Sequence, residues 1–245
     1  MENAQLIGLS RQRALLRQMD VVANNIANIN TTGFKVESVM FEEYKMPVAR
    51  DKDFMASDQI LSYTQDWATL HNFTGGSITQ TGNPLDIALQ GDGFLTVQTA
   101  SGEKYTRNGE LKINNSGILV TNSGDPILSE GGQIRFEPSE SNITIDAQGY
   151  ISTDSGSKGR LKIVSFENPQ ELTREGGNLF VGSNPIQDLS TKVSQGAIER
   201  SNVSSVLEMA RMIEISRAYQ SLSKIQKSHD DLRRSAIQKL GTLKA

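Results

Sequence analysis

Residues 15–33, LLRQMDVVANNIANINTTG, decide the architecture of the N-terminal end of this 245-residue chain. Their apolar side chains recur at intervals of 4, 3, 4 and 3 residues, at Leu15, Met19, Val22, Ile26 and Ile29. This a/d spacing is typical of a helix that packs along another helix in a coiled coil. We therefore expect a helix over residues 5–29. Gly33 follows it, and a glycine there suits the left-handed backbone that often ends a helix.

The C-terminal end carries a longer row of apolar side chains with the same spacing. We call each of these two rows a seam. From residue 215 onward, intervals of 3 and 4 separate Ile215, Ala218, Leu222, Ile225, His229, Leu232 and Ala236. We expect a helix over residues 203–240, which would be roughly 57 Å long at 1.5 Å per residue, with Ser201 or Asn202 as its N-cap. Such a helix is too long to bury its seam against a small domain. The N-terminal helix is its expected partner within the chain.

Four asparagines, Asn24, Asn25, Asn28 and Asn30, crowd the last turns of the N-terminal helix. Asparagine is a poor helix former, so their presence there is not explained by local propensity. One interpretation is a solvated helix end. The other is that the amides of Asn24, Asn25 and Asn28 hydrogen-bond to neighbouring subunits and not within their own chain.

The middle of the chain has a different composition from its ends. Of the 21 glycines, 17 lie in residues 75–182, and all 6 prolines lie in residues 47–185. Both ends thus contain no proline and little glycine, the residues that break helices, whereas the middle is rich in the residues that form turns. Short apolar runs at roughly ten-residue spacing predict an antiparallel sandwich or barrel, and Asn108-Gly109 predicts a tight hairpin turn.

These patterns predict an α+β fold in which long N- and C-terminal helices pair as a coiled coil around an inserted, antiparallel β-rich domain. We expect an N-terminal helix in residues 1–35, an extended connector in 36–74, the β domain in 75–194 and the C-terminal helix in 195–245. The two helical ends belong to one inner domain in this interpretation, although they lie far apart in the sequence.

Composition argues against several functional classes. The chain has no cysteine, only 2 histidines and a net charge of -3, so we expect no disulfide, no metal site and no nucleic-acid binding. No apolar run reaches eighteen residues, so we expect no membrane insertion. Gly91-Asp92-Gly93 lacks the third glycine of a dinucleotide fingerprint. We expect no cofactor and no catalytic residues, and hence a protein that is not an enzyme.

Four long motifs, in this order along the chain, resemble the bacterial flagellar rod and hook proteins. They are LRQMDVVANNIANINTTGFK (residues 16–35), TGNPLDIALQGDGFLTV (81–97), YTRNGELKINNSGILV (105–120) and QGAIERSNVSSVLEMARMIEISRAY (195–219). The resemblance implies an inner coiled-coil domain, an outward-facing β domain and polymerisation into the rod. It also implies export by the flagellar type III apparatus without a cleaved signal peptide.

Length and the two chain ends favour a proximal-rod subunit, which implies a location in the basal-body rod within the periplasm. The implied partners are other rod proteins, namely proximal-rod neighbours and the distal-rod protein, together with the export apparatus. Two alternatives remain: a distal-rod subunit of the same family and a cell-wall carbohydrate-binding module.

The expected subunit interface combines both seams with the asparagines and the glycine after the first helix. Its residues are Leu15, Met19, Val22, Asn24, Asn25, Ile26, Asn28, Ile29, Gly33, Ile215, Ala218, Leu222, Ile225 and Leu232.

Overall fold

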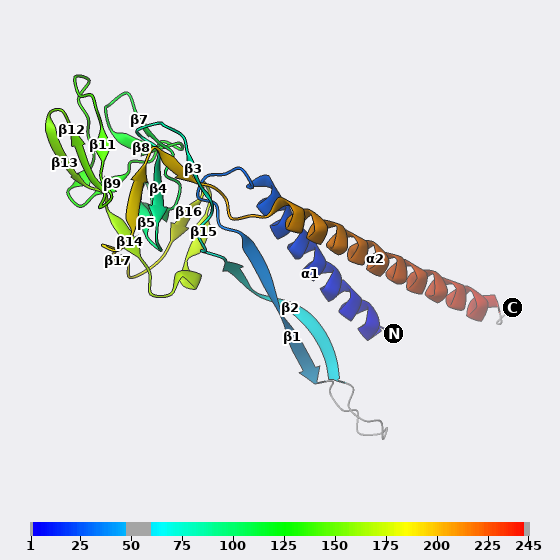
Figure 1. Cartoon of the computed structure of the whole chain (residues 1–245). Coiled ribbons are helices and arrows are strands. Elements are labelled where there is room, and N and C mark those ends of the chain that lie inside the picture. The colour runs from blue at the N-terminus through cyan, green and yellow to red at the C-terminus, as the bar shows by residue number, and fades with distance from the viewer. Residues whose placement is uncertain (1, 48–59, 243–245) are drawn as a thin grey trace. The chain divides into compact units, whose positions relative to one another are not determined.

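The computed structural model describes residues 2–47 and 60–242. A helix stands at each end of this part of the chain: α1 covers Glu2–Ala27 and α2 covers Ser205–Thr242 (Figure 1). Between the helices lie nineteen strands and one short 3-10 helix, η1 (Pro169–Glu171). The predicted combination of two terminal helices and a central β-rich region is thereby confirmed.

The chain divides into two compact units. The helical unit comprises the described parts of Met1–Ile26, Glu37–Leu70 and Ser204–Ala245, and the β unit comprises Ala27–Val36 and His71–Val203. Residues 27–35 and 195–203 thus belong to the β unit, whereas the ranges expected from the sequence place them in the helical ends.

Two long strands accompany the helices in the helical unit. Strand β1 (Glu37–Pro47) pairs with β2 (Ile60–His71) in a two-stranded sheet. The sequence predicts only an extended connector over residues 36–74, so the pairing of these strands is a new finding. A ribbon of two strands is marginally stable alone, so β1 and β2 depend on packing against other elements.

The β unit is built around one six-stranded antiparallel sheet with the order β15-β16-β6-β5-β14-β17. Strands β15 and β17 stand at its two ends, so this sheet does not close into a barrel. Its strands are β5 (Phe94–Thr99), β6 (Gly102–Thr106), β14 (Ile163–Ser165), β15 (Thr173–Glu175), β16 (Leu179–Val181) and β17 (Ile186–Gln187).

Shorter antiparallel pairings complete this unit: β18 with β4, β19 with β3, β7 with β8, β9 with β10, and β12 with both β11 and β13. The bounds are β3 (Ile78–Gln80), β4 (Ile87–Gln90), β7 (Leu111–Ile113), β8 (Leu119–Thr121), β9 (Leu128–Ser129), β10 (Gly132–Gln133), β11 (Thr144–Ile145), β12 (Tyr150–Thr153), β13 (Gly156–Arg160), β18 (Lys192–Gln195) and β19 (Ala197–Glu199). The last two strands return the chain to β3 and β4 before α2 begins.

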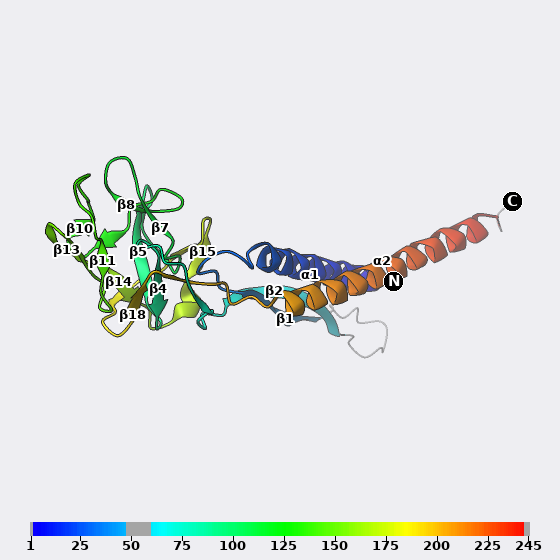
Figure 2. The same cartoon turned by 45° about the horizontal axis from the view of Figure 1, so that its top comes forward.

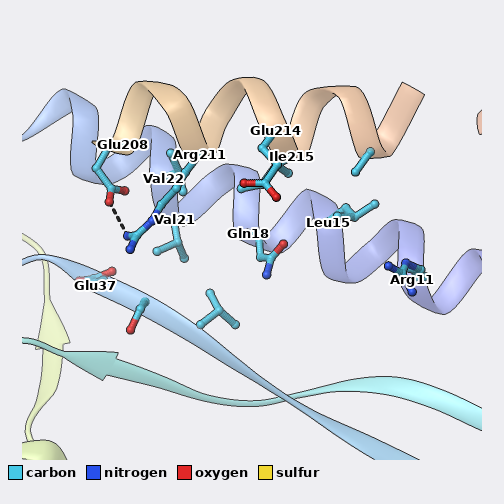
Figure 3. Close-up of a pocket in the computed structure, with 13 residues that line it drawn as sticks. Arg11, Leu15, Gln18, Val21, Val22, Glu37, Glu208, Arg211, Glu214 and Ile215 are labelled. Atoms are coloured by element: carbon cyan, nitrogen blue, oxygen red, sulfur yellow. Dashed lines mark hydrogen bonds and ion pairs between the residues drawn. The ribbon is translucent and has the colours of Figure 1, made fainter. Parts of the chain in front are cut away.

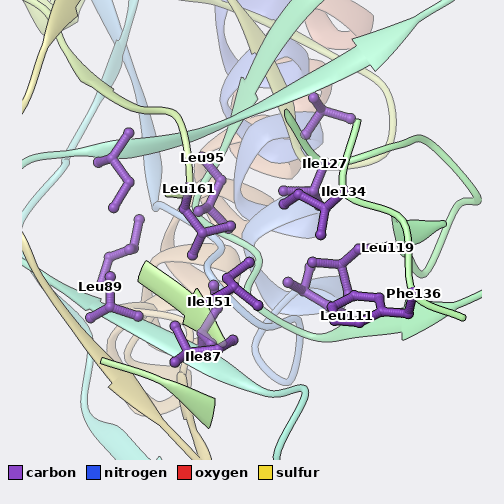
Figure 4. Close-up of a cluster of buried hydrophobic side chains, with 14 of the residues drawn as sticks. Ile87, Leu89, Leu95, Leu111, Leu119, Ile127, Ile134, Phe136, Ile151 and Leu161 are labelled. Atoms are coloured by element: carbon purple, nitrogen blue, oxygen red, sulfur yellow. The ribbon is translucent and has the colours of Figure 1, made fainter. Parts of the chain in front are cut away.

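The dry core lies almost entirely in the β unit. Its larger cluster includes Ile87, Leu95, Ile127, Ile151 and Leu161, all of them at most 1% exposed (Figure 4). In a second cluster, Phe94, Tyr105 and Phe180 pack with partly buried aromatic neighbours through edge-to-face ring contacts. Of the hydrophobic residues described in the helical unit, only Val21 and Val22 are buried.

The predicted hairpin at Asn108-Gly109 is wrong. These residues connect β6 to β7, but β6 pairs with β5 and β16, whereas β7 pairs with β8. Gly109 serves a close approach instead: its carbonyl accepts a hydrogen bond from the Ile87 amide at 2.9 Å, and a Cβ on it would lie 1.7 Å from the Ile87 oxygen. Ser101-Gly102, by contrast, does close the β5–β6 hairpin, with Gly102 at a φ of 119°.

Candidate functional site

The four predicted seam residues that fall on α1 all lie on its less exposed face. Val22 is buried, and Leu15, Met19 and Ile26 are half-buried. Ile29 lies beyond the end of the helix at Ala27 and is also half-buried. The spacing in the sequence therefore identified the correct face of this helix.

On α2 only some of the predicted seam residues lie on the less exposed face of the helix. Ile215 and Leu222 are half-buried as expected, whereas Ala218, Ile225 and Leu232 are exposed. The less exposed face runs instead through Glu208, Met212, Ile215, Tyr219, Leu222 and Gln226. Residues 218 and 219 both lie within about 60° of residues 215 and 222 around a helix, so apolar spacing alone does not separate them.

A groove of about 420 Å³ lies among three elements of the helical unit. It is lined by Leu15, Val21 and Val22 of α1, by Glu37 to Val39 of β1, and by α2 from Glu208 to Ala218 (Figure 3). In both views of the ribbon, α1 and α2 run side by side (Figure 2). The two helices and the ribbon thus come together over only a thin apolar layer.

Asn25 joins all three of these elements, and its side chain is fully buried. Its Nδ2 donates to the Glu37 carbonyl at 2.8 Å and to Glu208 Oε2 at 3.0 Å, while its Oδ1 accepts from the Glu37 amide at 3.0 Å. Arg211 donates to the second oxygen of Glu208 at 2.6 Å (Figure 3). The expectation that Asn25 acts between subunits and not within one is corrected, because its amide is used within the chain.

The other predicted polar positions differ from Asn25. Asn24 is exposed, and Asn28 is half-buried with its Oδ1 accepting from Thr31 Oγ1 at 3.0 Å. Gly33 has the expected left-handed backbone, with a φ of 68°, but it is fixed within the β unit. Its amide donates to the Glu199 carbonyl at 2.8 Å, and a Cβ would lie 2.4 Å from the Arg107 carbonyl. Packing inside the chain therefore requires glycine at position 33.

A buried cluster of three charges in the β unit was not foreseen. Lys35, Arg107 and Glu199 are each at most 2% exposed. Lys35 Nζ lies 2.6 Å from Glu199 Oε1, and Arg107 lies 3.3 Å from Glu199 Oε2. The cluster holds two cations and one anion, so Glu199 is the group that compensates both.

Further hydrogen bonds satisfy most of this cluster. Lys35 Nζ donates to the Thr74 carbonyl at 2.8 Å, the Gly76 amide donates to Glu199 Oε1 at 2.8 Å, and Arg107 donates to the Gly91 carbonyl. Arg107 Nε has no hydrogen-bond partner among the described residues. Burial lowers the pKa of Lys35 below its ordinary value, and the neighbouring Glu199 carboxylate opposes that shift.

Asn202 connects the segment that follows α1 to the segment that precedes α2, and we call this region, together with the Lys35–Arg107–Glu199 cluster, the buried junction. Asn202 is not the cap of α2. Its Oδ1 accepts from the Val36 amide at 2.8 Å, and its Nδ2 donates to the Asn72 carbonyl at 2.8 Å. Helix α2 begins three residues later, and the Ser204 carbonyl accepts from the Glu208 amide at 3.0 Å. The predicted N-cap at Ser201 or Asn202 is wrong, because the side chain of Asn202 is engaged with the segment that follows α1.

Two other kinds of site are absent from the described parts of the chain. Neither helix in these parts is long and apolar enough to cross a membrane. No group of three or more His, Cys, Asp and Glu side chains there is arranged to hold a metal ion.

Three family models match the chain. The model described as "Flagella basal body rod protein" matches residues 6–35, and "Flagellar hook protein FlgE/F/G D1 domain" matches residues 88–153. The model described as "Flagellar basal body rod FlgEFG protein C-terminal" matches residues 194–239. The matches follow the order of the motifs in the sequence.

Similarity to curated proteins extends over whole chains. The flagellar basal-body rod protein FlgF of Caulobacter vibrioides is 39% identical over 99% of this chain and 100% of its own length. The chain belongs to the flagellar basal-body rod protein family. A FlgF from Mesorhizobium japonicum is 30% identical over 99% of both chains, and a FlgG from Bacillus subtilis is 31% identical over 97% of both. Among these relatives, the rod protein is most similar to FlgF.

The buried junction of this rod protein falls inside the terminal family matches. Lys35 is the last residue of the N-terminal match, and Glu199 lies near the start of the C-terminal one. The two segments meet through the Lys35–Glu199 ion pair and through the bonds of Gly33 and Val36 described above. The end of the N-terminal match and the start of the C-terminal match therefore meet within the β unit.

Replacing Asn25 by alanine is expected to loosen the helical unit of the rod protein. The change leaves Glu208 and the Glu37 backbone without their buried partner, which costs about 1–3 kcal/mol. Trypsin should then cleave α1 after Arg11, Arg13 and Arg17 at least about five times faster, since cleavage follows the population of the open form. The matched control is the exposed neighbour Asn24→Ala, which should change the rate little. Equal rates for the two variants would show that the bonds of Asn25 contribute nothing.

Proposed function

We propose that this rod protein is a structural subunit of the proximal rod, located in the periplasm and without enzymatic activity. One observation carries the proposal: the helical unit has almost no core of its own, yet it carries large exposed apolar side chains on both helices. A unit of this kind gains most of its stability from neighbours, as expected of a subunit of a helical assembly. The partners are other rod proteins, including the distal-rod protein.

We propose further that α1 and α2 pair as an antiparallel coiled coil. The less exposed positions on both helices recur at intervals of 4 and 3 residues. The direction is supported at two points, since Asn25 bonds Glu208 and a Cβ on Gly8 would lie 2.9 Å from the Gln226 amide nitrogen. In this register Leu15 faces Tyr219, Met19 faces Ile215 and Val22 faces Met212.

Incorporation into the basal body tests the proposed function directly. Deleting the gene should abolish swimming, plasmid-borne protein should restore it, and basal bodies purified from the restored strain should contain the chain. A mock plasmid is the control. Normal swimming of the deletion strain, or basal bodies without the chain, would exclude a rod role. Purified protein should release no soluble fragments from peptidoglycan, and measurable release would contradict the absence of enzymatic activity.

The alternative of a distal-rod subunit is supported by the similarity to FlgG from Bacillus subtilis. Order of assembly separates the two alternatives. A proximal subunit should remain in basal bodies purified from a strain that lacks the distal-rod protein. Loss of the chain from those basal bodies would favour the distal position.

Export is proposed to proceed through the flagellar type III apparatus without removal of a signal peptide. A strain that lacks the export apparatus should retain the protein inside the cell. The protein recovered from basal bodies of the parent strain should begin at its encoded N-terminus, as mass spectrometry would show. A shortened N-terminus would contradict export without cleavage.

Limited proteolysis of the purified subunit should remove both helices before it attacks the β unit. Helices with little buried surface open readily in water, whereas the β unit holds nearly all the buried apolar side chains. Brief trypsin treatment followed by mass spectrometry should show early cuts at Arg11 to Arg17 and at Arg211 and Arg217. Termini that last as long as the β unit would show that the helical unit is stable without neighbours.

A further inference from the structure

The hydrophobic core of the β unit is complete earlier along the chain than its charge balance. The buried members of both hydrophobic clusters lie between residues 87 and 193. The last strand of the six-stranded sheet, β17, ends at Gln187. A growing chain that has reached residue 196 therefore already contains both clusters and the whole of this sheet. Only β19 and the segment up to Val203 are then missing from the β unit.

The buried charges are distributed differently along the chain. Both cations of the cluster, Lys35 and Arg107, are made before residue 196, whereas its anion, Glu199, is made after it. In the folded unit all three are at most 2% exposed, and the Glu199 carboxylate lies 2.6 Å from Lys35 Nζ and 3.3 Å from Arg107. A chain that closes its core early must therefore bury two cations without the carboxylate that pairs with both of them.

The other polar contacts of the two cations do not replace this carboxylate. Lys35 and Arg107 each donate to a backbone carbonyl as well, but these acceptors carry no net charge. Asp92 is a second carboxylate whose charge acts on Lys35, but its side chain is exposed, so solvent screens it. Burial of a cation without its anionic partner is strongly unfavourable. Closure of the β unit is therefore opposed until Glu199 is in place.

Glu199 also fixes the chain on both sides of the cluster. Its backbone carbonyl accepts from the Gly33 amide at 2.8 Å, and its Oε1 accepts from the Gly76 amide at 2.8 Å. Gly33 lies in the segment that follows α1, and Glu199 lies in the segment that precedes α2. The residue that balances the buried charges thus also joins these two segments within the β unit.

We infer that Glu199 controls when the β unit closes: the unit stays open on a growing chain and closes only when residues 197–203 have emerged. This inference deepens the proposed export and rests on it, because a chain that leaves the cell through a channel must not close its β unit during synthesis. The control is built into the order of the charges along the chain, with two cations early and their shared anion late.

Cleavage of the full chain tests the electrostatic basis of this control. Lys112 and Arg135 have exposed side chains, but their backbones pair with β8 and with Ile118, so trypsin cuts there only when the β unit opens. Glu199→Gln should raise the cleavage rate at these two sites at least about 100-fold. The matched control is Asp92→Asn, which removes an exposed carboxylate and should change the rate less than about threefold.

A neutral variant shows whether the cations cause the opening. Lys35→Met, Arg107→Met and Glu199→Gln together remove all three charges, and replacing a buried ion cluster by apolar side chains is often neutral or stabilising. The cleavage rate of this triple variant should return to within about tenfold of the parental rate. Parental cleavage of the Glu199→Gln chain would overturn the inference. Cleavage of the triple variant as fast as that of Glu199→Gln would overturn it as well.

Chains stalled on the ribosome test the timing. One chain is stalled with its residues up to 196 outside the exit tunnel, and a second with its residues up to 203 outside. Trypsin should cut the first at Lys112 and Arg135 at least about 100 times faster than the second. At the first position, a chain with Lys35→Met and Arg107→Met should be cut at least about ten times more slowly than the parent, because it has no cations to bury.

The outcomes separate the inference from the proposed function. Protection of the parent chain with only its residues up to 196 outside would overturn control by Glu199. Equal cleavage of the parent and the double methionine chain at that position would mean that the missing strand β19 delays closure, and would also overturn the inference. Neither result involves the basal body, so the proposed rod function would stand. Absence of the chain from basal bodies, with stalled chains behaving as expected, would overturn the rod function alone.

Discussion

Replacing Glu199 by glutamine is expected to lower the free energy of unfolding of the β unit by about 3–5 kcal/mol. Glu199 is the sole anion of a buried cluster with Lys35 and Arg107, at 2.6 and 3.3 Å. Glutamine keeps the shape of the side chain but removes the charge, so two buried cations lose the carboxylate that pairs with both of them. Breaking buried ion pairs in this way is strongly destabilising. A decrease in Tm of about 6–20 °C should follow for a chain of this size.

Two matched variants make this prediction specific. Glu103→Gln removes one partner of an exposed ion pair, with Lys162 Nζ at 2.8 Å, and should cost less than about 1 kcal/mol. Lys35→Met removes one of the two cations and leaves Glu199 balanced by Arg107, so it should destabilise less than Glu199→Gln. Thermal unfolding followed by circular dichroism gives all three values. Similar decreases in Tm for the Glu199 and Glu103 variants would mean that the buried cluster stabilises the β unit no more than an exposed ion pair does.

The helices were predictable because their signals are local. Glycine and proline avoid both ends of the chain, and apolar residues repeat with helical spacing. These signals identified the less exposed face of α1. The exposed Ala218 and the half-buried Tyr219 show where such signals stop: both positions lie near the line through Ile215 and Leu222. Their difference depends on the direction from which another element approaches, which spacing does not contain.

The asparagines illustrate a second limit. Asn24, Asn25 and Asn28 look alike in the sequence, yet only Asn25 is fully buried. What distinguishes it is the backbone of Glu37, twelve residues away, and the carboxylate of Glu208, which is 183 residues away. Neither contact leaves a pattern within a helix-length window. The resemblance to rod proteins pointed to this segment, but it did not assign a partner to each amide.

The charged junction could not be derived from spacing either. Lys35 and Glu199 are 164 residues apart and read as ordinary surface charges beside helix ends. The one usable signal was that both lie in the motifs that resemble rod proteins, residues 16–35 and 195–219. The hairpin predicted at Asn108-Gly109 was wrong for a related reason. The two residues do lie in a connection between strands, but the position of Gly109 is set by its long-range hydrogen bond with Ile87.

Replacing Val22 by aspartate is expected to abolish swimming. Val22 is buried among α1, α2 and β1, in a unit where Val21 and Val22 are the only buried ones among the described hydrophobic residues. The change loses about 1.5–3 kcal/mol of apolar burial. It also removes a carboxylate from water in a groove that the carboxylates of Glu208 and Glu214 already line, and where Arg211 is already bonded to Glu208. Because every subunit in the rod would carry the same defect, the cost is repeated throughout the assembly. Leu222→Asp on α2 should have the same direction of effect.

A control variant and two further measurements distinguish a defect confined to the helical unit from misfolding of the whole protein. Ser223→Asp adds the same charge at the exposed neighbour of Leu222 and should leave swimming close to normal. Both aspartate variants at the seam should accumulate to parental levels and keep the thermal unfolding of the β unit, since its core is separate from Val22. Swimming halos measure the outcome. A Val22→Asp strain that swims as well as the Ser223→Asp strain would mean that the seam between the helices does not need to be dry, and the proposed coiled coil would then be wrong.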